Sequence, residues 1–126
     1  MKIPEDLKYT KDHEWVKLEG KTATVGITDF AQGELGDIVY VEVETLDENL
    51  EQNEVFGTVE AVKTVSDLHL PLSGTIVEFN EDLEDEPENV NNDPYGKGWM
   101  IKLKLDNPEE AEDLLSAKDY EALTAQ

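Results

Sequence analysis

The chain has 126 residues, 38% of them hydrophobic, and this length suits one domain with a modest core. Lys and Arg together number 10 against 31 Asp and Glu, which gives a net charge of −21 at pH 7. Such a charge repels phosphate backbones and anionic lipid, so it disfavours nucleic-acid and membrane-surface partners and suits docking on basic patches of other proteins.

The chain contains no cysteine, so any thiol or redox chemistry would have to be carried by an attached group. No apolar run approaches about 18 residues, the length that spans a bilayer. The first residues have neither the apolar core of a signal peptide nor an Arg-rich transit pattern. We therefore expect a cytoplasmic protein, or a mature protein of the mitochondrial matrix if the source is eukaryotic.

Most of the chain has the composition and alternation that are typical of β-strands. This pattern predicts strands over residues 12–18, 22–27, 38–43, 55–62, 65–72, 74–79 and 99–105. The first two would form a hairpin, with Trp15 facing inward. Thr28 fits the N-cap of a short helix that ends at Leu35, and Gly36 fits its C-terminal stop. We therefore predict a mainly β fold with short helices.

The acidic stretch over residues 80–94 is predicted to be a solvated loop. It lacks the ligand spacing of a calcium loop. At its end, Asp93-Pro94-Tyr95-Gly96 has Pro and Gly at the positions that suit a type I turn. Residues 81–93 are therefore interpreted as a solvated acidic face.

The C-terminal tail has helix signals. Asn107-Pro108-Glu109-Glu110 places an N-cap residue, a proline and two acids at a helix start, and Leu114 and Leu115 would supply the apolar side of that helix. Ser116 fits the cap of a second short helix, whose Tyr120 and Leu123 would face the body.

We therefore expect one domain over residues 1–126. Its core would span about residues 12–105, followed by a helical segment over about residues 107–124.

A short repeat crosses these elements. Thr28-Asp29-Phe30 and Gly36-Asp37-Ile38-Val39 recur, at an offset of 38 residues, as Ser66-Asp67-Leu68 and Gly74-Thr75-Ile76-Val77. Two copies of a β unit are too few for a solenoid. They predict a closed sandwich of two related halves, each covering the apolar face of the other.

Lys63 lies between two predicted strands, Val55 to Val62 and Val65 to Leu72. It is the only Lys or Arg between Lys21 and Lys97, in a stretch with 19 Asp and Glu. One interpretation is a solubilising turn lysine. The other is an attachment point, because a strand–turn–strand unit holds an acylable amine away from the body.

Patterns for catalysis are absent from the sequence. His13 and His69 are far apart and cannot alone supply a three-ligand zinc site, and no Ser-His-Asp order is evident. Glu14 and Asp67 support a narrower hypothesis: if the fold brings them near an arm on Lys63, they could pair with a cationic group on it. Ordinary surface charge is the alternative for both.

The segment Glu60-Ala61-Val62-Lys63-Thr64-Val65-Ser66-Asp67, followed by Pro71-Leu72-Ser73-Gly74, resembles the lipoyl-lysine segment of the H proteins of the glycine cleavage system. The resemblance extends nearly end to end. The further matching segments are His13-Glu14-Trp15, Val25-Gly26-Ile27-Thr28-Asp29, Leu35-Gly36-Asp37, Asp93-Pro94-Tyr95-Gly96, Gly98-Trp99 and Leu114-Leu115 to Tyr120.

This resemblance implies a single lipoyl-carrier domain, a flattened β-barrel sandwich of the lipoyl/biotinyl type with short helices and a C-terminal helical tail. It implies a monomer with lipoate in amide linkage to Lys63, added by a lipoate ligase or lipoyl transferase. It also implies acids, at the positions of Glu14 and Asp67, beside the loaded amine.

The implied function is that of a carrier and not of an enzyme. The arm would shuttle the aminomethyl group of glycine between a glycine decarboxylase, an aminomethyltransferase and a dihydrolipoyl dehydrogenase. Two alternatives stay open: a lipoyl donor or relay for other lipoylated complexes, and an unmodified acidic adaptor of the same fold.

A few residues depart from the family pattern. Ala61, His69 and Leu70 stand where other residues are usual, which bears on how well a given lipoate ligase accepts this hairpin. Biotin carriers of the same general fold usually have Met on both sides of the lysine. Val62 and Thr64 therefore argue against biotin.

Overall fold

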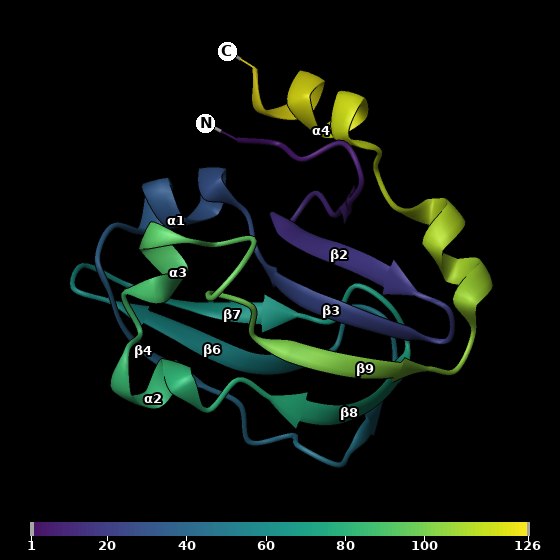
Figure 1. Cartoon of the computed structure of the whole chain (residues 1–126), viewed down its shortest axis with the longest axis horizontal. Helices are drawn as coiled ribbons and strands as arrows, with labels where there is room; N and C mark the ends of the chain where they lie inside the picture. The colour runs from purple at the N-terminus through teal and green to yellow at the C-terminus, as the bar shows by residue number, and fades with distance from the viewer. Residues whose placement is uncertain (1, 126) are drawn as a thin grey trace.

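The structure is a computed structural model that describes residues 2–125. Within this range, a six-stranded and a three-stranded antiparallel sheet make up most of the molecule (Figure 1). The larger sheet contains, in spatial order, β1 (Lys8–Tyr9), β2 (Glu14–Glu19), β3 (Thr22–Ile27), β9 (Ile101–Leu105), β8 (Gly74–Phe79) and β5 (Asn49–Leu50). The smaller sheet contains β4 (Ile38–Glu42), β6 (Val55–Ala61) and β7 (Val65–His69). The predicted mainly β sandwich is confirmed.

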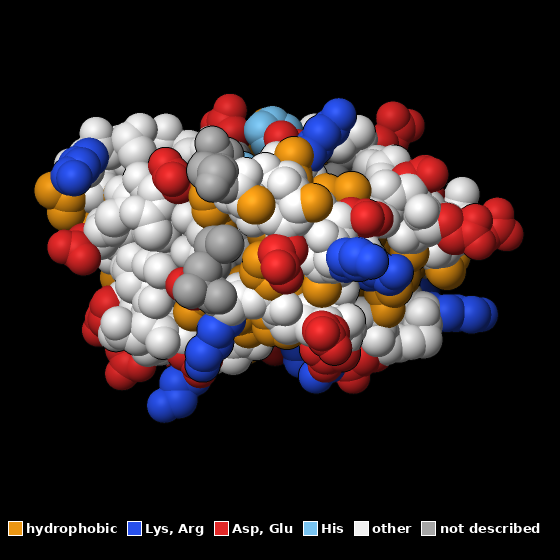
Figure 2. All heavy atoms as spheres, turned by 90° about the horizontal axis from the view of Figure 1, so that it is seen from above, with side chains coloured by type: hydrophobic (Ala, Val, Ile, Leu, Met, Phe, Trp, Pro, Cys, Tyr) orange, Lys and Arg blue, Asp and Glu red, His pale blue; other side chains and the backbone are white. Residues whose placement is uncertain are grey.

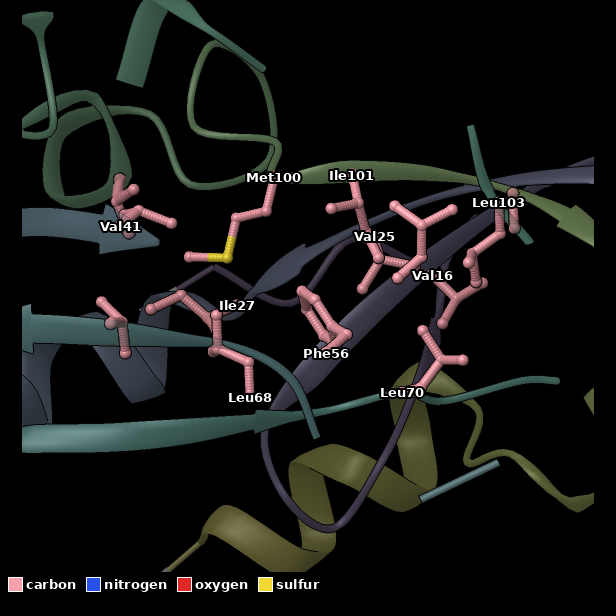
Figure 3. Close-up of a cluster of buried hydrophobic side chains, with 14 of the residues drawn as sticks. Val16, Val25, Ile27, Val41, Phe56, Leu68, Leu70, Met100, Ile101 and Leu103 are labelled. Atoms are coloured by element: carbon pink, nitrogen blue, oxygen red, sulfur yellow. The ribbon is translucent and has the colours of Figure 1, made fainter. Parts of the chain in front are cut away.

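Apolar side chains from both sheets meet in one core, as Figure 3 shows. Alternate residues of each strand point to the same face of a sheet, so each strand contributes its apolar set to the shared interior. The larger sheet supplies Val16, Val25, Ile76, Ile101 and Leu103, and the smaller sheet supplies Ile38, Val41, Phe56, Val59 and Leu68. Burial of these side chains is the main force that holds the sheets together.

The first hairpin forms as predicted, with β2 paired to β3 through a turn at Gly20, whose φ is +66°. Trp15 is buried and pairs with Gly26. A Cβ on Gly26 would lie 2.7 Å from Trp15 Nε1, so a larger residue there would clash with the indole. Trp15 Nε1–H donates to the carbonyl of Pro94 at 2.9 Å, which fixes the ring between the sheet and the turn after α3.

Helix α1 (Asp29–Leu35) matches its prediction at both ends. Thr28 Oγ1 accepts from the backbone N–H of Ala31, and Gly36 ends the helix with φ of +80°. A left-handed residue at this position is usually glycine, since it has no Cβ to clash.

The prediction of a loop over residues 80–94 is wrong. The segment forms two short helices, α2 (Asp82–Asp85) and α3 (Asn89–Asn92), before the turn at 93–96, which is confirmed by a hydrogen bond from Gly96 N–H to the Asp93 carbonyl. Leu83 and Val90 are fully buried in the main core, while the acids between them are exposed. These apolar side chains anchor to the core a segment whose acids form a solvated face.

The tail packs on a second, smaller cluster made by Leu7, Tyr9, Trp15, Ala117 and Tyr120. Its first helix, η1 (Pro108–Asp113), is 3₁₀, and Asn107 makes no side-chain cap, contrary to expectation. Ser116 caps α4 (Ala117–Thr124) as predicted, by accepting from Asp119 N–H. Tyr120 faces the body, but the prediction for Leu123 is wrong, since it is 47% exposed and Thr124 is buried instead.

The two copies of the sequence repeat share part of their structure. Gly36 and Gly74 both lead into strands, β4 and β8, which lie in different sheets. The preceding segments differ, because Thr28 caps α1 whereas Ser66-Asp67-Leu68 lies within β7. The end residues of the predicted domain, 1 and 126, lie outside the described range. No helix within that range is long and apolar enough to cross a membrane.

Candidate functional site

Lys63 lies at the tip of the β6–β7 hairpin, and its side chain is exposed. The turn is closed by Ala61 N–H, which donates to the Thr64 carbonyl at 2.7 Å. It is braced from outside by Val62 N–H, which donates to the Asp37 carbonyl at 3.1 Å. The turn extends beyond the sheet at the end of the molecule where α1 lies (Figure 1). This lysine is thus held on a rigid mount that leaves its amine free.

A pocket of about 360 Å³ lies between the two sheets and α1. We name it the Glu14–Asp67 pocket after the two acids singled out in the sequence, both of which line it, as do Asp12 and Glu34. Its other walls are largely apolar and come from β3, α1, β6 and β7, among them Ile27, Phe30 and Leu68. Lys63 is not among its lining residues. The structure therefore brings together the two acids that are 53 positions apart in the sequence.

Glu14 is buried, with 2% of its surface exposed. One carboxyl oxygen accepts from Thr10 Oγ1–H at 2.8 Å, and the other accepts from His69 N–H at 3.2 Å. Loss of solvent raises the pKa of Glu14 to about 8, against the opposing effect of these two hydrogen bonds. A carboxyl with this pKa is mostly protonated at neutral pH, and a nearby cation favours its ionised form.

Asp67 lies in β7, opposite Thr58 of β6, and is exposed at the rim of the pocket. Lys63 precedes it by four residues, which corresponds to roughly 13 Å along an extended chain. An arm on Lys63 therefore needs only to fold back along its own hairpin to reach the rim. The pocket combines an exposed acid at its entrance with a buried acid inside it.

His13 is a pocket residue that sequence reasoning had set aside. It has a positive φ of 70°, which is uncommon for a residue with a Cβ. Its ring packs on Phe30, with centroids 4.7 Å apart, and its Nδ1 lies 2.8 Å from the hydroxyl of Tyr120. The sequence had no signal for this contact, because the partners are 107 positions apart.

The described part of the chain has no candidate metal site, since it contains no group of three or more His, Cys, Asp or Glu side chains that could hold an ion. The arrangement offers an exposed amine on a hydrogen-bonded turn, and an acidic pocket with apolar walls. Two stacked antiparallel sheets with an exposed lysine on a hairpin match the carrier domain of the lipoyl type that the sequence resemblance implies.

Comparisons with known proteins agree with this class. A family model described as "Glycine cleavage H-protein" matches residues 7–126. The "Glycine cleavage system H protein" of Salinibacter ruber is 59% identical over 124 residues, with 98% of this chain and 100% of the relative covered. The protein of the same name from Staphylococcus carnosus is 57% identical over 123 residues, with 98% of both chains covered.

Among solved structures, the crystal structure of a glycine cleavage system H protein from Mycobacterium marinum matches with a TM-score of 0.85. It is 39% identical, and the match covers 95% of this chain and 97% of that one. The chain therefore belongs to the glycine cleavage H-protein family. It is a non-catalytic carrier component of the glycine cleavage system, in a family that carries lipoate.

Proposed function

We propose that Lys63 carries the lipoyl group in amide linkage, and that the arm shuttles the aminomethyl group of glycine between the enzymes of the glycine cleavage system. The observation that carries this proposal is the position of Lys63 at an exposed hairpin tip, with Val62 and Val65 exposed on either side. Lipoate would supply the dithiol that a chain without cysteine lacks.

The Glu14–Asp67 pocket supports a resting place for the loaded arm. Its apolar walls suit a hydrocarbon arm. Its acids, Glu14 and Asp67 with Asp12 and Glu34, suit a positively charged amine. Inside the pocket, a cation would favour the ionised form of Glu14 and so lower its pKa. Asp67 would attract the amine at the rim, where water screens the interaction more strongly.

We propose three partners that the arm serves in turn: a glycine decarboxylase, an aminomethyltransferase and a dihydrolipoyl dehydrogenase. A lipoate ligase or lipoyl transferase would attach the arm. The net charge of −21 supports docking on basic surfaces of such proteins, because opposite charge accelerates encounter. A role as lipoyl donor for other complexes uses the same lysine, whereas an unmodified adaptor does not.

Intact-mass analysis of the protein from its native source tests the attachment. We expect a lipoyl-sized mass increment that maps to Lys63, and we expect Lys63→Arg to keep the fold but to abolish glycine–bicarbonate exchange in the reconstituted system. Lys97→Arg is the matched control, since Lys97 is also exposed but lies outside the hairpin. An unmodified Lys63 under lipoate-replete conditions would contradict the proposal, as would exchange that survives Lys63→Arg.

A further inference from the structure

We infer that Tyr120, on the C-terminal helix α4, is a positioning residue that keeps His13 neutral and oriented in the wall of the Glu14–Asp67 pocket. The inference rests on the proposed function, because it gives α4 a part in retaining a positively charged amine in that pocket. A protonated His13 would place a second cation beside the amine and weaken its retention.

The contact runs through a chain of three buried or half-buried groups. The Tyr120 hydroxyl lies 2.8 Å from His13 Nδ1 and 2.7 Å from Thr28 Oγ1. Tyr120 and Thr28 are both fully buried. The backbone N–H of Thr28 also donates to the His13 carbonyl at 3.0 Å, so the two residues are fixed to each other independently of their side chains.

The surroundings of Thr28 determine which group donates in each of these hydrogen bonds. Its Oγ1 already accepts from Ala31 N–H at 3.1 Å, as the cap of α1. The acceptor within reach of its own hydroxyl hydrogen is the Tyr120 oxygen. If Thr28 donates to Tyr120, then Tyr120 is free to donate to His13 Nδ1, and every buried hydroxyl is satisfied. Burial raises the pKa of Tyr120 to about 12, so the phenol stays protonated and can act as a hydrogen-bond donor.

A His13 that accepts at Nδ1 is neutral and carries its hydrogen on Nε2. Burial lowers the pKa of His13, and this outweighs the carboxylates of Asp12 and Glu34, which would raise it. Glu14 and Asp67 are the other titratable groups that line the pocket with His13, while Phe30, Thr28 and Tyr120 bring no charge. The remaining ring nitrogen of this pocket residue is then the donor Nε2–H.

Helix α4 can hold this position because the tail is anchored at Tyr120 and just before it. Its ring stacks on Tyr9, with centroids 4.7 Å apart and planes 10° apart. Just before α4, Leu115 exchanges two backbone hydrogen bonds with Tyr9, at 2.7 and 2.9 Å. The N-terminal strand, the tail helix and the pocket wall are therefore joined through the Tyr120 side chain.

The hydrogen bond from Tyr120 to His13 is tested by ¹⁵N NMR of the imidazoles in the unmodified protein. His13 and His69 are the only histidines in the sequence. We expect the Nε2–H tautomer for His13. Tyr120→Phe keeps the ring stack but removes the donor, so the pKa of His13 should rise by about 0.5 to 1 unit. His69 should not change, and it serves as the internal reference.

Tyr9→Phe is the matched control, because it removes a buried hydroxyl from the same stack without touching His13. We expect it to leave the His13 tautomer and pKa as they are. An Nδ1–H tautomer in the wild type would overturn the inference, whether or not Tyr120→Phe folds. So would an unchanged His13 pKa in Tyr120→Phe.

The link to the pocket is tested on lipoylated, amine-loaded protein by the rate at which the amine is lost. Near pH 6, Tyr120→Phe should shorten the lifetime about 5-fold relative to wild type, and the ratio should approach one near pH 8, where His13 is neutral in both. Equal lifetimes at both pH values would overturn the inference and leave the carrier function standing. A lysine that takes no lipoate would instead overturn the proposed function, and the intact mass shows this separately.

Discussion

Glu14 is the buried acid of the pocket, and its pKa is strongly raised. A carboxyl with 2% exposure and two hydrogen-bond donors pays a large desolvation cost when it ionises. Its pKa of about 8 expresses that cost, since the unfolded chain would ionise Glu14 near its ordinary value of 4.5. A binding site for a cation tolerates this cost because the cation, once present, offsets it.

The pH dependence of folding should reveal this carboxyl. Between about pH 4.5 and 8 the folded state holds a proton on Glu14 that the unfolded state has lost, so Glu14 makes stability fall as pH rises through this window. Glu14→Gln mimics the protonated form and should remove a slope of up to about 1.4 kcal/mol per pH unit. Urea unfolding at pH 5, 6, 7 and 8 measures it.

The control for this experiment is Asp67→Asn, an exposed acid of the same pocket, which should leave the slope nearly unchanged. Equal slopes for wild type and Glu14→Gln would show that Glu14 ionises normally. In amine-loaded protein, the same Glu14→Gln change should also shorten retention of the amine, most strongly at the pH where the wild-type carboxyl is charged.

At the level of elements, Asn91 in α3 joins three segments near the hairpin that bears Lys63. Its amide N–H groups donate to Gln32 Oε1 at 2.9 Å and to the Gly36 carbonyl at 2.8 Å. Its oxygen accepts from Ile38 N–H at 2.9 Å. Asn91 therefore satisfies the end of α1 and the start of β4 together. Asp37 lies between Gly36 and Ile38, and its carbonyl accepts the hydrogen bond that braces the Lys63 turn.

Removing the Asn91 side chain should destabilise the contacts between α3, the end of α1 and the start of β4. We expect Asn91→Ala to lower the free energy of unfolding by about 2–3 kcal/mol, because it leaves the Ile38 N–H and the Gly36 carbonyl without their partner. Chemical denaturation measures the loss, and amide hydrogen exchange at Val62 should rise. Asn92→Ala, an exposed change in the same helix, should cost under about 0.5 kcal/mol. Similar costs for both variants would refute the bridging role.

Considered as a whole, the molecule carries charge that its own contacts do little to neutralise. In residues 2–125 the structure has one ion pair, between Lys102 Nζ and Glu78 at 3.8 Å, with both side chains about half exposed. Acidic side chains are spread over the face shown in Figure 2, with lysines between them. A net charge of −21 therefore acts mainly as long-range self-repulsion, which opposes the compact state.

Salt should stabilise this protein. Raising NaCl from 0.05 to 0.5 M shortens the Debye length from roughly 14 to 4 Å, so repulsion between surface carboxylates is largely screened. We expect the thermal midpoint to rise by several degrees over this range at pH 7. The rise should be much smaller at pH 4, where many carboxylates are protonated. A midpoint that does not move at pH 7 would show that the net charge is not a destabilising factor.

The sequence by itself determined the features that depend on near neighbours. Strand alternation, the Thr28 and Ser116 caps, the stop at Gly36 and the hairpin around Lys63 each depend on residues a few positions apart. The isolation of Lys63 among acids is likewise visible without coordinates. Such features could be predicted because a cap, a turn or an alternating strand is decided by local backbone geometry.

Tertiary structure decided the rest. Leu83, Val90 and Asn91 ordered an acidic stretch that local composition reads as loop, because their partners lie in α1, β4 and the core. The Glu14–Asp67 pocket exists only once β2 and β7, from opposite sheets, lie on either side of it, and Tyr120 reaches His13 only when the tail folds back over β1. The physical reason is that burial and hydrogen bonding across sheets depend on which distant residues meet, and that depends on the packing of the whole chain.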